Sequence, residues 1–155
     1  MSKVEFYRSL TSQIAGLTDG EPDLIANLSN VSALLNQSLS DLNWVGFYLR
    51  RSDDELVLGP FQGKPACIRI PVGKGVCGTA VATGKIQRVA DVHAFPGHIA
   101  CDGASNSEIV LPIYCQGQVV AVLDIDSPLF DRFDEEDEAG LANMIAVLEN
   151  FSWNR

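Results

Sequence analysis

The first forty residues of the chain carry apolar side chains at helical spacing. From Val4 to Leu17 the apolar positions recur mostly three or four residues apart, which predicts an amphipathic helix. Thr18-Asp19-Gly20 interrupts this pattern, and Pro22 suits the first turn of a second helix that extends to about Leu39. We therefore expect two consecutive helices at this end of the chain.

From Trp44 the pattern changes to short apolar runs that are typical of strands. Residues 44–49 and 55–58 predict a hairpin, and residues 66–70 predict a third strand ended by Pro71. Residues 76–82 are expected to form one or two helical turns closed by Gly84, followed by a short strand over residues 87–89. Residues 108–113 and 118–125 predict a second hairpin about Gln116-Gly117.

The last part of the chain returns to helical spacing. Asp134 and Asp137 are suited to cap a helix. Its buried stripe would comprise Leu141, Met144, Ile145, Leu148 and Phe151. Helices at both ends, with hairpin strands between them, predict one α+β domain over residues 1–155, in which helices cover a central antiparallel sheet. Between these elements, Asp91 to Ser107 forms a long segment with little periodicity, and such segments in compact domains are usually functional.

Composition narrows the classes of partner. The chain has 155 residues, a formal charge of −9 and only 11 Lys plus Arg, which argues against nucleic acid and against an anionic membrane surface. The first residues do not resemble a signal peptide, and no apolar run is long enough to span a bilayer. We expect a cytoplasmic protein with a small-molecule ligand. Its four cysteines would then be reduced, at least between reaction events, and would serve as buried small side chains, metal ligands or redox groups.

Two cysteines stand near other candidate features. The glycine-rich residues 71–78 lack the P-loop pattern, so a tight turn leading into a short helix is favoured over a phosphate site. Cys77 lies near the start of that helix, where the helix dipole would lower its thiol pKa, although burial as a small apolar side chain is the commoner fate. Cys101 follows His98 by three residues, so His98 either stabilises a thiolate or bonds the backbone. We expect no metal site, because the paired ligand spacings of zinc sites are missing.

Three carboxylates and two aromatic residues can meet on one face of the sheet. Asp124 and Asp126 alternate within a strand, and Glu108 begins the strand before it. Such a group could bind an ammonium ion, and a member with a raised pKa could act as an acid; alternatively, the carboxylates cap backbone groups at the sheet end. Trp44 and Tyr48 share a strand face, where they either form the wall of a pocket or pack in the core.

Several longer motifs occur together in this chain. They are residues 59–67 (GPFQGKPAC), residues 75–78 (GVCG), residues 97–102 (GHIACD), residues 107–110 (SEIV) and residues 123–127 (LDIDS). With them the chain resembles the free methionine-(R)-sulfoxide reductases over most of its length. The resemblance implies a GAF-like fold, usually as a homodimer, that reduces free L-methionine-(R)-sulfoxide and not the residue within proteins. It implies no bound cofactor or metal, and recycling by thioredoxin with NADPH and thioredoxin reductase.

The resemblance also implies roles for individual residues. Cys101 matches the nucleophile, Cys67 the resolving cysteine, and Cys77 a supporting or alternative resolving cysteine, whereas Cys115 matches no functional position. Glu108, Asp124 and Asp126 match the residues that hold the substrate and assist protonation of its oxygen. Trp44 and Tyr48 match the aromatic wall. These residues supply what sulfoxide reduction needs: a thiolate, an acid and a second thiol that closes a disulfide, for which at least one loop must move.

Two other functions remain open at this level. A sensory GAF domain would bind a cyclic nucleotide or another small ligand without chemistry, and would be indifferent to Cys101→Ser. A metal-binding redox sensor would use Cys101, Cys77 and His98. The sequence does not decide whether Cys67 or Cys77 resolves first, or which carboxylate protonates the oxygen.

Overall fold

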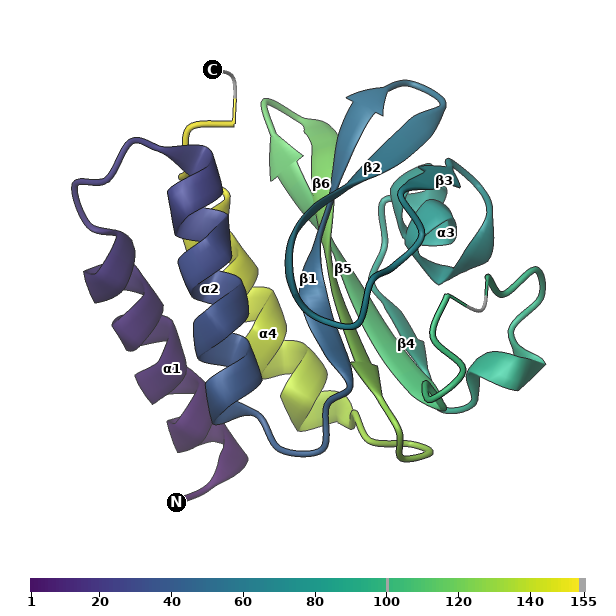
Figure 1. The fold of residues 1–155 in the computed structure, drawn as a ribbon. Helices are drawn as coiled ribbons and strands as arrows, with labels where there is room; N and C mark the ends of the chain where they lie inside the picture. Colours follow the sequence, from purple (N-terminus) through teal and green to yellow (C-terminus); the bar gives the residue numbers. More distant parts are fainter. Residues whose placement is uncertain (100, 154–155) are drawn as a thin grey trace.

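A six-stranded antiparallel sheet forms the centre of the computed structural model, which describes residues 1–99 and 101–153 (Figure 1). The strand order is β3-β2-β1-β6-β5-β4. The strands are β1 (Trp44–Ser52), β2 (Glu55–Gly63), β3 (Arg69–Pro71), β4 (Gln87–Val89), β5 (Ser107–Cys115) and β6 (Gln118–Ser127). Both expected hairpins, β1–β2 and β5–β6, are confirmed, and β1 pairs with β6 to join them.

Three helices lie on one side of the sheet and one lies on the other (Figure 1). On the first side are α1 (Lys3–Thr18), α2 (Leu24–Ser38) and α4 (Glu135–Leu148); on the second is α3 (Gly75–Thr83), which ends at Gly84 in the left-handed conformation. Asp134 and Asp137 form the expected capping box of α4. The second helix begins at Leu24, so Pro22 lies just before it and not in its first turn as expected. Asp23 caps the helix by accepting the amide N–H of Ala26. The α+β, GAF-like expectation is confirmed.

Alternation along the central strands produces two apolar layers. Val45, Phe47 and Leu49 of β1 pack in the layer beneath α1, α2 and α4, whereas Trp44 and Tyr48 belong to the layer beneath α3. The odd-numbered residues 109–113 and 121–125 continue the first layer on β5 and β6. The even-numbered positions of these strands therefore face α3, and this side of the sheet holds the polar residues discussed below.

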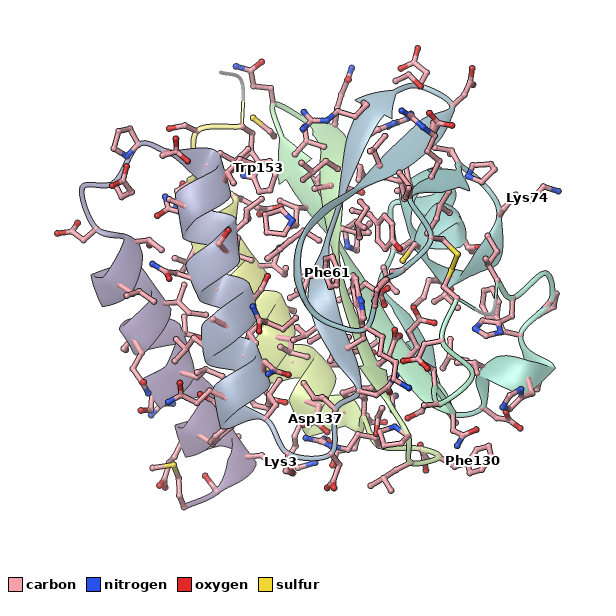
Figure 2. The ribbon with its side chains drawn as sticks, viewed as in Figure 1. Lys3, Phe61, Lys74, Phe130, Asp137 and Trp153 are labelled. Carbon is pink, nitrogen blue, oxygen red and sulfur yellow. A yellow bond between two sulfur atoms is a disulfide. The ribbon has the colours of Figure 1, made fainter. Side chains whose placement is uncertain are left out.

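Helices α1 and α4 are joined by a buried polar contact. The Tyr7 hydroxyl donates to Asp137 Oδ1 at 2.6 Å, and Lys3 Nζ lies 2.8 Å from Asp137 Oδ2. Lys3 and Asp137 are labelled in Figure 2. Asp137 thus accepts bonds from α1 while it caps α4. Because these partners satisfy the buried carboxylate, it holds α1 against α4. This contact lies on the side of the sheet opposite to the site described below.

The segment before β3 departs from the expected strand over residues 66–70. Only Arg69–Pro71 pair with β2, and β2 itself continues to Gly63, where it pairs with Trp44. Residues 64–68 leave the sheet because the Tyr48 hydroxyl and a disulfide bond hold Cys67 over its face. Ile68 is consequently 65% exposed. Phe151 lies beyond the end of α4, although it still packs on the apolar layer.

The long segment after β4 contains one short 3-10 helix, η1 (Val92–Ala94), capped by Asp91. The rest of it crosses the α3 side of the sheet and returns to β5 (Figure 1). No helix in the described residues is long and apolar enough to cross a membrane.

Candidate functional site

A small pocket lies between the α3 side of the sheet and two loops, residues 64–68 and, among the described residues, 98–99 with 101–105. Side chains from β1, β5, β6 and α3 form its floor, and both loops contribute to its rim. Its cavity measures about 50 Å³. Since one water needs roughly 10–15 Å³ of such space, the cavity holds a few waters and must widen before an amino acid can enter.

Three carboxyl groups form the polar part of the floor. Glu108 lies directly opposite Asp126 in the β5–β6 ladder, and Asp124 lies two residues along on the same face. Glu108 and Asp124 are only 7% and 5% exposed. The convergence that the strand pattern predicted is therefore confirmed as a geometry.

Burial and mutual repulsion alter the ionisation of this group. Burial raises the pKa of Glu108 well above its usual value, and the charges of Asp124 and Asp126 add to the effect. Burial also raises the pKa of Asp126, with the Asp124 charge as the next cause. The pKa of Asp124 is raised by burial but less strongly, because hydrogen bonds from Glu108 and Cys77 favour its charged form. The group thus keeps a proton to higher pH than isolated carboxyl groups would.

The same carboxyl groups lack basic partners. Within the described residues, no Lys, Arg or His forms an ion pair with Glu108, Asp124 or Asp126. Asp124 Oδ1 and Asp126 Oδ1 are buried without a hydrogen-bond donor from the described protein groups. Buried carboxylates in this condition are costly unless a proton or a bound cation neutralises them, so the floor is suited to a positively charged ligand.

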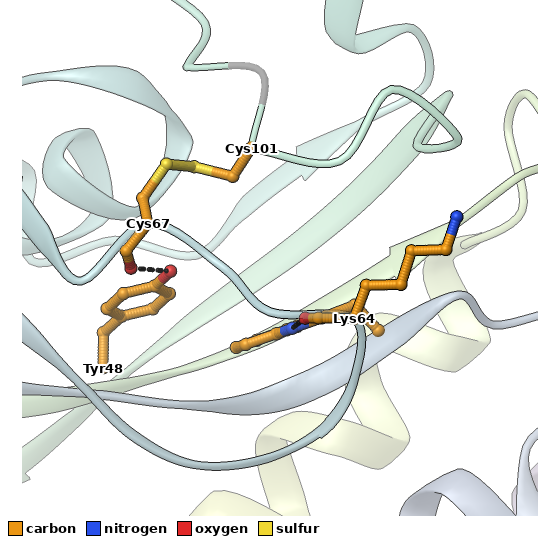
Figure 3. The surroundings of a disulfide bond; sticks show 5 residues. Tyr48, Lys64, Cys67 and Cys101 are labelled. Carbon is orange, nitrogen blue, oxygen red and sulfur yellow. Dashed lines mark hydrogen bonds between the residues drawn. A yellow bond between two sulfur atoms is a disulfide. The ribbon is translucent and has the colours of Figure 1, made fainter.

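An aromatic wall stands beside the carboxyl groups. The rings of Trp44 and Tyr48 stack with centroids 5.8 Å apart, and Phe61 stacks on Trp44 at 5.1 Å. Phe61 was not predicted from the sequence; it packs over Gly46, where any Cβ would overlap it. The wall is fixed by two hydrogen bonds, from Trp44 Nε1 to the Lys64 carbonyl at 3.2 Å and from the Tyr48 hydroxyl to the Cys67 carbonyl at 2.8 Å (Figure 3).

Cys67 and Cys101 form a disulfide bond at the rim of the pocket (Figure 3). Their Cα atoms are 5.6 Å apart, although 34 residues separate them along the chain. Both residues are half-buried, so the bond remains accessible from solvent. The structure thus corresponds to an oxidised state in which the two rim loops are tied together, and this accounts for the small cavity.

Cys77 lies inside the pocket and outside the disulfide. It is on α3 and 4% exposed. The expectation of a lowered pKa is wrong: burial raises the pKa of Cys77, and the charge of Asp124 adds to this effect. Both causes outweigh the dipole of a short helix. Cys115 lies at the far end of β5 and does not line the pocket.

His98 also lines the pocket, but it does not form the metal group considered from the sequence. Within the part of the chain that the structure describes, the group of three possible ligands is Cys77, Glu108 and Asp124, while Cys101 is engaged with Cys67. Burial lowers the pKa of His98, and the nearby His93 lowers it further, so the ring is neutral at neutral pH. Its position suits a hydrogen-bonding role at the rim.

Asn43 connects the sheet to the loop of Cys101, and sequence reasoning did not identify it. Its Nδ2 donates to Asp102 Oδ2 at 3.0 Å and to Ser105 Oγ at 2.9 Å, while its amide N–H donates to the Asp126 carbonyl at 3.0 Å. Asp102 in turn accepts the Ala104 N–H, and these bonds lower the pKa of Asp102. No local motif signals this role, because the partners lie about sixty residues apart in the sequence.

Comparisons with known proteins agree on one group. Residues 23–148 match the GAF domain family. The free methionine-R-sulfoxide reductase of Escherichia coli (strain K12) is 60% identical over 149 residues, which cover 96% of this chain and 90% of that protein. The free methionine-R-sulfoxide reductase of Neisseria meningitidis, solved in complex with its substrate, superposes with a TM-score of 0.92 at 46% identity, covering 96% of this chain and 89% of that one. The fRMsr of Staphylococcus aureus, solved in complex with substrate, gives 0.87 at 55% identity, covering 92% and 93%.

Proposed function

The chain belongs to the GAF domain family and, within it, to the free methionine-R-sulfoxide reductases, and from this premise we propose that it reduces free L-methionine-(R)-sulfoxide through Cys101 and Cys67. One observation supports the proposal above all others. A disulfide between Cys67 and Cys101 closes a pocket whose floor carries three carboxyl groups, of which Glu108 and Asp124 are buried and Asp126 is half-buried. A redox pair and an acid thus lie within one enclosure.

The first step that we propose transfers the sulfoxide oxygen. The Cys101 thiolate attacks the sulfoxide sulfur and forms a sulfur–sulfur bond while a proton passes from the carboxyl group to the oxygen. The protonated oxygen then moves to the Cys101 sulfur. The new sulfur–sulfur bond and the sulfur–oxygen bond of the substrate break, methionine leaves as the thioether, and Cys101 becomes a sulfenic acid. The substrate gains two electrons, and the Cys101 sulfur loses them.

The second step closes the disulfide. The Cys67 thiol attacks the sulfenic sulfur of Cys101, and the oxygen departs as water with the thiol proton. The Cα separation of 5.6 Å satisfies the geometry of the product. Cys67 is the resolving residue in this account, because Cys77 remains buried beneath the bond in the oxidised state.

The carboxyl cluster serves as the source of the proton and as the ammonium site. Glu108 has its pKa raised well above the usual value by burial and by two neighbouring carboxylates, so it carries a proton that it can give to the leaving oxygen. Asp124, whose pKa is raised less strongly, together with Asp126 takes the substrate ammonium. Trp44 and Tyr48 pack on the apolar stem of the substrate. A methionine sulfoxide within a peptide lacks that ammonium and is excluded.

An external dithiol must regenerate the enzyme. We assign this role to thioredoxin, supplied with electrons by NADPH and thioredoxin reductase, and the half-buried Cys67–Cys101 bond is accessible to it. Such a cycle needs a reducing compartment, as expected for the cytoplasm. The resemblance also leads us to propose a homodimer. Sedimentation should then give twice the chain mass of 16.8 kDa, and a single-chain mass would contradict it.

Turnover of the two free sulfoxide epimers tests the function. NADPH oxidation is followed with thioredoxin and thioredoxin reductase for the parent protein, for Cys101→Ser and for the matched control Cys115→Ser. We expect turnover of the R epimer only, abolished in Cys101→Ser and retained in Cys115→Ser. Reversible binding of a ligand with no turnover, equal in all three proteins, would instead support the sensory GAF function.

A further inference from the structure

The pocket contains a second set of ligand atoms that the proposed redox cycle does not need. Cys77 Sγ and one carboxylate oxygen each from Glu108 and Asp124 lie within 4.8 Å of one another. We propose that the reduced protein binds a thiophilic divalent cation such as Zn²⁺ through Cys77, Glu108 and Asp124. The cation would occupy the place of the substrate ammonium and so inhibit the enzyme.

The three atoms are spaced somewhat more widely than the ligands of a bound zinc ion. Zinc bonds to sulfur at about 2.3 Å and to carboxylate oxygen at about 2.0–2.2 Å, so in a tetrahedron two ligand atoms lie roughly 3.4–3.7 Å apart. Since the three atoms here all lie within 4.8 Å of one another, side-chain rotations that move them by about 1 Å bring them onto one ion. A water would complete the tetrahedron, which leaves the ion open to exchange.

The ligands are held by three different elements. Cys77 is on α3, Glu108 on β5 and Asp124 on β6, and each is less than a tenth exposed. Rigid ligands from packed elements reduce the entropic cost of binding an ion. One thiolate with two carboxylates is a mixed soft and hard set, which suits Zn²⁺ and Co²⁺ better than Mg²⁺ or Ca²⁺.

An unsatisfied atom points independently to a missing ligand. Asp124 Oδ1 is buried and has no hydrogen-bond partner among the described protein groups, and Asp124 as a whole is 5% exposed. Lys74 lines the pocket, but its side chain projects outward to solvent in Figure 2 and forms no ion pair with these carboxylates in the described residues. The protein therefore leaves the neutralising charge to a ligand.

Ion binding and catalysis make different demands on the cysteines. The ion displaces the protons of Cys77 and Glu108 to solvent, and no electron is transferred. Cys67 and Cys101 are not ligands in this arrangement. Metal binding therefore stands without the proposed function, whereas competition with methionine sulfoxide rests on it. The two parts can fail separately.

Cobalt titration of the reduced protein, without chelator, tests the site. A thiolate bound to Co²⁺ gives a near-ultraviolet charge-transfer band. We expect this band in the parent, in Cys115→Ser and in the double variant Cys67→Ser, Cys101→Ser, and its loss in Cys77→Ser with at least about 100-fold weaker binding. A band that persists in Cys77→Ser, disappears in the double variant, or is missing in the parent would overturn the proposal.

Two further measurements test Asp124 as a ligand and the competition with substrate. Asp124→Asn should weaken Co²⁺ binding while the Cys77 side chain is unchanged, and thermal melts show whether each variant remains folded. Unchanged Co²⁺ binding in a folded Asp124→Asn would count against the site.

Competition between the ion and the substrate is tested in Cys101→Ser, which does not turn over. In this variant free methionine-(R)-sulfoxide should displace the ion. If the parent reduces the sulfoxide but the sulfoxide does not displace the ion from Cys101→Ser, only the proposed competition is refuted. Cobalt binding in a parent that reduces no sulfoxide would refute the proposed function alone.

Discussion

Cys67, Cys77 and Cys101 lie at one pocket in two different environments. Cys67 and Cys101 are paired at the rim, whereas Cys77 is buried with its pKa raised by burial and by Asp124. The thiol variants should therefore differ in kind. Cys101→Ser should form no methionine, and Cys67→Ser should form one methionine per chain and then stop as a sulfenic acid, detected by trapping with a carbon nucleophile. Sustained thioredoxin-dependent turnover by Cys67→Ser would show that another thiol resolves the intermediate.

Glu108 is the carboxyl group that we assign as the acid. Glu108→Gln keeps the shape of the side chain but removes the proton that it would donate. General acid catalysis typically contributes 10²–10⁴-fold, so we expect a loss of roughly that size in the rate of single-turnover methionine formation. The matched control is Glu55→Gln. Glu55 is an exposed glutamate on β2 and pairs with Arg69. A loss below about tenfold in Glu108→Gln would remove this residue from the proton step.

The raised pKa of Glu108 also makes the folding stability depend on pH. A carboxyl group whose pKa is higher in the folded than in the unfolded protein stabilises the fold below its unfolded value, near 4.5, and this stabilisation is lost as pH rises through the folded pKa. The parent should therefore lose stability relative to Glu108→Gln between pH 5 and pH 8. Chemical denaturation of both proteins at each pH, in the same redox state, measures this difference; an equal difference at both pH values would contradict the assignment.

Individual residues differed in how far the sequence could predict them. Strand alternation placed Glu108, Asp124 and Asp126 on one face, because side-chain direction along a strand is a local property. It could not give the pKa of Cys77, which depends first on burial beneath other elements and then on carboxylates from β5 and β6. The metal group was also missed, since its ligands come from α3, β5 and β6 and have no characteristic spacing in the sequence.

At the scale of elements, the loop of Cys101 is fixed to the sheet by one side chain. Asn43→Ala removes the bonds to Asp102 and Ser105 and leaves both without that donor. We expect about 1–2 kcal/mol lower stability and roughly tenfold slower disulfide closure, because the nucleophile spends less time near Cys67. Asn36→Ala, at an exposed position on α2, is the control. A stability loss with an unchanged rate of closure would leave Asn43 only a structural role.

The elements that were predicted well are those determined by local patterns. The expected helices and hairpins were confirmed because helical stripes, strand runs and turn residues act over a few positions. The strand over residues 66–70 was shifted, because the contacts of Cys67 with Tyr48 and Cys101 come from distant parts of the chain. The same reason applies to the pairing of β1 with β6, which joins the two hairpins.

At the scale of the whole molecule, three parts of the fold bound the pocket. The sheet, α3 and the two tied loops leave a cavity of about 50 Å³ in the oxidised state. We therefore expect the reduced protein to act on free methionine-(R)-sulfoxide and to act at least about 100-fold less well on the same group inside an acetylated and amidated peptide, which lacks the ammonium charge. Comparable kcat/KM values for the two substrates would mean that the pocket does not recognise a free amino acid.

The most direct test of the account is a single turnover of the prereduced protein with free methionine-(R)-sulfoxide and no reductant present. Methionine is counted against protein, and the disulfides formed are mapped by mass spectrometry after acid quenching. The account predicts one methionine per chain and one bond, between Cys67 and Cys101, with Cys77 still a thiol. Methionine formed without that bond, or a bond that contains Cys77 in the parent protein, would contradict it.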